Sequence, residues 1–70
     1  MLLITINMLE KLAHDYNESS EGLKSYYANK VITLIDLLER SGHKVKVRWH
    51  EMYHIIAEIE VDGFSVMRLQ

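Results

Sequence analysis

IAEIEVDGFSVMRL, residues 56–69, is the stretch that decides the fold. Apolar and acidic side chains alternate up to Val61, and the Asp62-Gly63 pair that follows is favoured in two-residue hairpin turns. The alternation reaches back to Val45, with apolar residues at odd positions. We therefore expect three antiparallel strands at about 44–49, 53–61 and 64–69, with the odd positions of the first two facing the core.

Two helices are expected before these strands, because apolar residues recur at helical spacing over residues 7–17 and again over 20–41. Residues 1–6 are apolar on both faces and β-branched at positions 4 to 6, which favours a short buried strand over the start of a helix. The expected fold class is α+β with the order (β)-α-α-β-β-β. It consists of an antiparallel sheet of three to four strands with two helices packed on one face.

The length and composition indicate a single small globular domain spanning residues 1–70. The chain is 49% hydrophobic and 26% charged, with a formal net charge of −2, and it contains no cysteine. A chain of this size buries only about 60% of the surface that its unfolded form exposes, so self-association is the expected additional source of stability. The absence of a leader pattern and of a membrane-spanning segment favours a cytoplasmic protein.

The segment His50-Glu51-Met52-Tyr53-His54 matches the H-E-x-x-H pattern of zinc proteases. That pattern needs a helix to bring both histidines onto one face, whereas an extended strand separates them by about 13 Å. The surrounding alternation predicts strand and turn, so the match is interpreted as a coincidence. If the chain turns at 50–52, His50 and His54 are weak candidates for a metal site or for a pair that titrates together.

The open face of the expected sheet, away from the helices, is the candidate binding surface. Pairing Arg48 with His54 and Lys46 with Ile56 places an apolar cluster on this face. The residues expected to contact a partner are Ile56, Met67, Leu69 and Met52. Such a cluster suits contact with a second copy or with another protein.

A basic rim on the same face supports an alternative function, RNA binding or RNA cleavage. The rim consists of Lys44, Lys46, Arg48, His50 and His54. Together with Glu58, these side chains supply an acid, a base and a phosphate-neutralising group. The expected element order is similar to that of the ribosome-dependent ribonuclease toxins of toxin–antitoxin pairs. Those proteins are typically strongly basic, whereas this chain is slightly acidic.

The sequence thus favours a non-enzymatic protein-interaction module, a regulator or inhibitor that acts by binding and self-associates as a homodimer through its sheet. No catalytic residue and no cofactor are expected. The expected partners are another protein or a second copy, with nucleic acid as the alternative and no membrane. The small size is also typical of accessory proteins of phages and other mobile elements.

Overall fold

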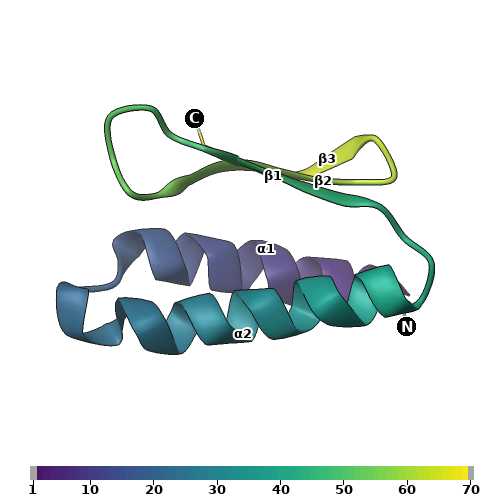
Figure 1. Ribbon diagram of the computed structural model, residues 1–70, viewed down its shortest axis with the longest axis horizontal. Coiled ribbons are helices and arrows are strands. Elements are labelled where there is room, and N and C mark those ends of the chain that lie inside the picture. Colours follow the sequence, from purple (N-terminus) through teal and green to yellow (C-terminus); the bar gives the residue numbers. More distant parts are fainter. Residues whose placement is uncertain (1, 70) are drawn as a thin grey trace.

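The computed structural model describes residues 2–69, which form two helices followed by three strands. Their bounds are Leu2–Glu18 for α1, Glu21–Arg40 for α2, Val45–Trp49 for β1, Ile56–Val61 for β2 and Phe64–Arg68 for β3. The sheet is antiparallel with strand order β1-β2-β3. Figure 1 shows the sheet as one layer and both helices together as a second layer on one side of it. The expected α+β class is confirmed.

The predicted strand over residues 1–6 is wrong, because α1 already begins at Leu2, and Met1 lies outside the described residues. No fourth strand occurs in residues 2–69. Helix α1 packs along α2, and at its start Leu2 and Thr5 line the same hollow as Leu37 and Leu38 of α2. Packing of this kind outweighs the weak strand preference of β-branched residues.

The core lies between the two layers and draws on all five elements. Leu9, Ile59 and Met67 are its largest fully buried side chains. The remaining buried members of this cluster are Ala13, Tyr16, Val31, Leu38, Ile56 and Val61. Burial of a side chain of this size contributes about 1.5–3 kcal/mol, so this small set holds the layers together.

A bulge in β2 changes which residues face the core. Arg48 pairs with Glu58 but Trp49 pairs with Ile56, so Ala57 is the extra residue. A single extra residue reverses the alternation of a strand. Ile56 and Ile59 therefore both enter the core, although one position is even and the other odd.

A second bulge in β3 has the same consequence. Ser65 pairs with Glu60 but Met67 pairs with Ile59, which leaves Val66 as the extra residue and turns Met67 inward. The turn before it forms as expected. Asp62 and Gly63 both have positive φ, 53° and 86°, as a tight hairpin turn of this kind requires.

The loop between β1 and β2 is longer than predicted, and β2 begins at Ile56 rather than near residue 53. The end of α1 fixes this boundary. The Asn17 side chain accepts a hydrogen bond from the Ile56 N–H at 2.7 Å and donates one to the Ile56 carbonyl at 2.8 Å. The Tyr16 hydroxyl donates to the His54 carbonyl at 3.4 Å. The expected pairing of Lys46 with Ile56 is therefore wrong, because Ile56 is opposite Trp49 and Lys46 is opposite Glu60.

We expect the Asn17→Ala variant to lower the free energy of unfolding by about 1–3 kcal/mol, because it leaves the N–H and carbonyl of the buried Ile56 without partners. Urea denaturation followed by circular dichroism measures the change. The matched control is Asn7→Ala, an exposed asparagine on the same helix. Equal effects of the two substitutions would show that Asn17 does not hold the strand in place.

Candidate functional site

The open face of the sheet is charged, and three of its charged side chains form one ion-paired group. Glu58 lies on the central strand between Arg48 and Arg68 of the two edge strands. Its carboxylate accepts from Arg68 at 3.0 Å and from Arg48 at 3.4 Å. Glu58 is only 9% exposed, so two guanidinium groups cover one nearly buried carboxylate.

The surroundings of Glu58 favour its ionised form. The Ser65 hydroxyl, followed by the Arg68 guanidinium, holds the pKa of the Glu58 carboxyl below its ordinary value of 4.5. A general acid requires the opposite, a carboxyl whose pKa is raised. The triad of Arg48, Glu58 and Arg68 thus has the properties of a structural ion-pair network.

The structure separates the four residues predicted to bind a partner. Ile56 and Met67 are 2% and 1% exposed and belong to the core, so the prediction that they lie on the open face is wrong. The two bulges are the physical reason. Leu69 is half-buried, and its N–H donates to the Ala57 carbonyl at the end of the sheet. Met52, at 79%, is exposed in the loop between β1 and β2.

The predicted basic rim is also divided. Lys46 and Arg48 lie in β1, and Lys44 immediately precedes it. All three alternate with apolar residues and are exposed. His50 and His54 lie in the loop after β1, where the His50 ring accepts a hydrogen bond from the Met52 N–H at 3.1 Å. The expected pairing of Arg48 with His54 is wrong, because Glu58 is opposite Arg48.

The H-E-x-x-H segment is a loop with bends and not a helix. It therefore lacks the helix face on which both histidines of a zinc protease bind the metal. Within residues 2–69 there is no cluster of three or more side chains able to hold a metal ion.

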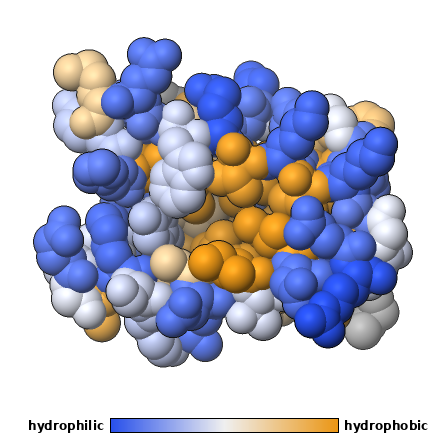
Figure 2. Space-filling view, viewed as in Figure 1, coloured by the Kyte–Doolittle hydropathy of each residue, from blue (hydrophilic) through white to orange (hydrophobic). Residues whose placement is uncertain are grey.

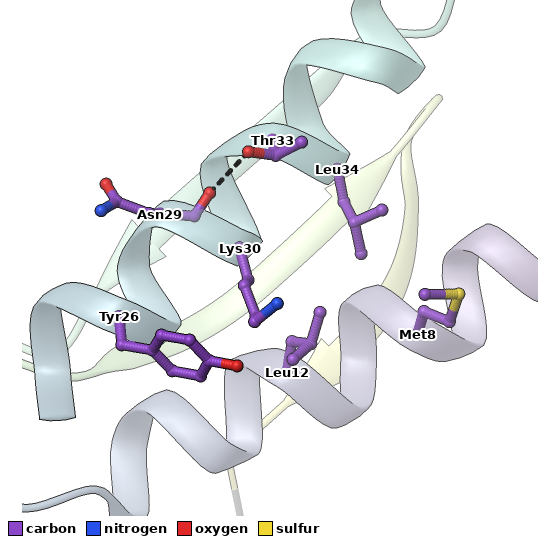
Figure 3. Close-up of a pocket in the computed structure, with 7 residues that line it drawn as sticks. All are labelled: Met8, Leu12, Tyr26, Asn29, Lys30, Thr33 and Leu34. Carbon is purple, nitrogen blue, oxygen red and sulfur yellow. Dashed lines mark hydrogen bonds between the residues drawn. The ribbon is translucent and has the colours of Figure 1, made fainter.

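A groove between α1 and α2 is the candidate binding site (Figure 3). It lies on the side of the helices that faces away from the sheet and has a volume of about 400 Å³. We call it the outer groove. Its lining residues are Met8, Leu12, Tyr26, Asn29, Lys30, Thr33 and Leu34.

The shape of the outer groove follows from helix geometry. Leu12 of α1 and Leu34 of α2 point toward one another along its floor in Figure 3. Met8 and Tyr26 form its sides and are 50% and 55% exposed. The Lys30 ammonium lies 4.8 Å from the centre of the Tyr26 ring, which places one cation over an aromatic wall.

The outer groove combines apolar walls with a few polar groups. Its lining residues include one cation but no carboxylate and no imidazole, the groups that most often transfer protons in enzymes. Apolar walls with a few polar groups are typical of a surface that binds another molecule.

Sequence reasoning missed the outer groove because each helix was assigned one apolar stripe directed at the core. The residues Ile4 and Met8 on α1, with Tyr26 and Leu37 on α2, form a second apolar set and are all at least half exposed. Their spacing of four and eleven residues places each pair on one helix face. That spacing is the signal that could have identified the groove.

Comparisons with known protein families, with curated proteins and with solved structures find no match to this chain. Neither helix in residues 2–69 has both the length and the apolar character needed to cross a bilayer.

We expect the stability of the fold to fall with acid below about pH 4.5, because the folded-state pKa of Glu58 lies below its ordinary value of 4.5. A carboxylate of this kind contributes its full stabilisation above the unfolded pKa and loses it as the pH falls through the folded pKa. Asp62 acts in the same direction, because the Lys44 backbone N–H and then His43 lower its pKa.

The Glu58→Gln variant tests this assignment. Its melting temperature should be lower than that of the wild type at neutral pH. The melting temperature should also fall less for this variant than for the wild type between about pH 7 and about pH 3, as measured by thermal circular dichroism. Glu60→Gln is the matched control, because Glu60 has no ion pair within 4.0 Å among residues 2–69. Parallel pH profiles for the wild type and Glu58→Gln would contradict the assignment.

Proposed function

We propose that this protein is a non-enzymatic interaction module that acts by binding and that self-associates through the outer groove. The observation that carries the proposal is the exposed apolar surface of the helices. Among residues 2–69, eight of the twelve exposed large apolar side chains lie on α1 and α2. The proposed contact surface is therefore the helical layer, in place of the sheet face expected from the sequence.

The areas of the two layers support this choice. Helices of 17 and 20 residues are about 26 and 30 Å long and about 10 Å wide, so the outer side of the helical layer projects about 560 Å². Three strands of five or six residues, about 4.8 Å apart, project only about 250 Å². A stable interface takes about 800 Å² of accessible surface from each partner. The helical layer comes closer to this value than the sheet face does.

A second copy is the occupant that this area and composition favour. In a twofold dimer the same patch serves on both subunits, so one apolar groove is sufficient for both sides of the contact. Packing two helical pairs against each other would form a four-helix layer with the sheets on the outside. A small domain gains stability from the extra apolar burial.

The biological role that fits such a module is that of a regulator or inhibitor that acts by occupying a partner. The lack of a proton-transfer set in the groove and the internal pairing of Glu58 support binding without catalysis. A cytoplasmic location is part of the proposal and is supported by the lack of cysteine in the sequence.

We expect the Met8→Asp variant to weaken the dimer at least tenfold, because it places a carboxylate in the apolar contact twice, once from each subunit. Sedimentation equilibrium from about 1 μM to about 1 mM covers dissociation constants of moderate and weak dimers. Tyr26→Asp should act in the same way from the other wall of the groove. Circular dichroism checks that both variants remain folded.

The matched control is Met52→Asp, the same substitution at an exposed methionine of the loop between β1 and β2. It should leave the dimer unchanged. A wild-type chain that remains monomeric at the highest concentration would refute self-association. If Met52→Asp dissociates the dimer and Met8→Asp does not, the contact lies at the loop between β1 and β2 and not at the outer groove.

A further inference from the structure

We infer that the free edge of β1 is a second docking surface, which accepts an extended segment of another protein whose acidic side chains alternate with apolar ones. This edge is separate from the outer groove, and the inference does not depend on self-association. It is carried by three features of β1, which are its unpaired backbone, its row of cations and the uncovered apolar surface beneath it.

The backbone of β1 has hydrogen-bonding groups available on one side. Among residues 2–69, β1 is an edge strand that pairs with β2 alone. The Asp62 N–H donates to the Lys44 carbonyl at 2.8 Å, and an antiparallel ladder alternates bonded and non-bonded pairs along the strand. Positions 46 and 48 therefore bond to β2, while the N–H and carbonyl groups of Val45 and Val47 point to the free edge. These are the groups that an added strand uses.

The charges of β1 define the chemistry of that strand. Lys44, Lys46 and Arg48 alternate along β1 and are exposed. On its inner side, β1 pairs Lys46 with Glu60 and Arg48 with Glu58. Arg48 shares Glu58 with Arg68, and Lys46 makes no ion pair within 4.0 Å among residues 2–69. The four cations Lys44, Lys46, Arg48 and Arg68 thus stand against the three carboxylates Glu58, Glu60 and Asp62, which leaves one positive charge that a further acidic strand would balance.

The chain itself shows which pattern pairs with β1. Its inner neighbour β2 reads Glu58-Ile59-Glu60-Val61, with carboxylates opposite the cations and apolar side chains toward the core. A partner segment with the same alternation would place its carboxylates beside Lys46 and Arg48 on the outer edge. A second copy of β1 would instead set cations against cations, which is destabilising, so this edge does not fit self-pairing.

The apolar side of an added strand also has a place to lie. Figure 2 shows the side of the molecule on which β1 and α2 are nearest to the reader, with hydrophobic side chains uncovered in a hollow between the sheet and the helices. Val45 and Val47 of β1 are half-buried and pack against the core. Trp49 at the end of β1 is 52% exposed, and Ile32, which helix geometry places on the flank of α2 away from the outer groove, is 61% exposed.

The probe for this surface is a seven-residue synthetic peptide in which glutamate alternates with valine and isoleucine, compared with a matched peptide that has lysine at each glutamate position. Binding is followed by the fluorescence of Trp49, the only tryptophan, which should shift to shorter wavelength as the ring is covered. We expect the acidic peptide alone to bind, more weakly as salt rises. Amide hydrogen exchange should slow at Val45 and Val47.

The charge-reversed variants Lys46→Glu and Lys44→Glu should each weaken binding of the acidic peptide at least tenfold and allow the lysine peptide to bind. The matched control is Lys11→Glu, a charge reversal at a 77% exposed lysine on α1, which should change nothing. The Met8→Asp variant should bind the peptide like the wild type. This result separates the edge from the outer groove.

Three results would overturn the inference. The first is no binding of the acidic peptide to the folded wild-type protein, and the second is equal binding of the acidic and lysine peptides. The third is binding of an oligouridine RNA, and not of the acidic peptide, in a manner that Lys46→Glu abolishes. That outcome would assign the cations of β1 to phosphate groups.

Discussion

The arrangement of this protein depends on one local constraint, the fixed position of Ile56 at the end of α1. The Asn17 side chain satisfies both backbone groups of this residue, so β2 must begin there. The strand then needs one extra residue to regain its pairing with β1, and Ala57 supplies it as a bulge. Because the bulge reverses the alternation, Ile56 and Ile59 both reach the core.

The same constraint determines the character of the open face. After the bulge, Glu58 points outward between Arg48 and Arg68, and the two edge strands are joined across the central strand through one carboxylate. The bulge in β3 turns Met67 inward and Arg68 outward, which places the Arg68 guanidinium beside Glu58. The apolar cluster expected on this face is therefore absent, and the ion pairs of Glu58 with Arg48 and Arg68 lie at its centre. Surplus positive charge remains only along β1.

Two surfaces are then left for contact with other molecules, and they differ in chemistry. The outer groove is apolar with one cation, and its area suits a copy of the same surface. The β1 edge combines free backbone groups with cations and suits an extended acidic segment. A protein that self-associates through its helices would keep both β1 edges exposed, because the helices and the sheet form separate layers (Figure 1). Such a dimer would present two identical edges to its partners.

The sequence by itself determined the features that depend on local pattern. The helical spacing of apolar residues specified two helices, strict alternation specified strands, and the left-handed preference of Asp62-Gly63 specified the hairpin turn. It also specified the α+β class and the cationic character of β1. Only the tertiary structure decided that residues 2–6 are helical, because the contact of α1 with α2 is made between residues far apart in the chain. Only the tertiary structure decided the register as well. A bulge depends on the distant Asn17, and one extra residue exchanges the buried and exposed sets, so Ile56 and Met67 became core residues.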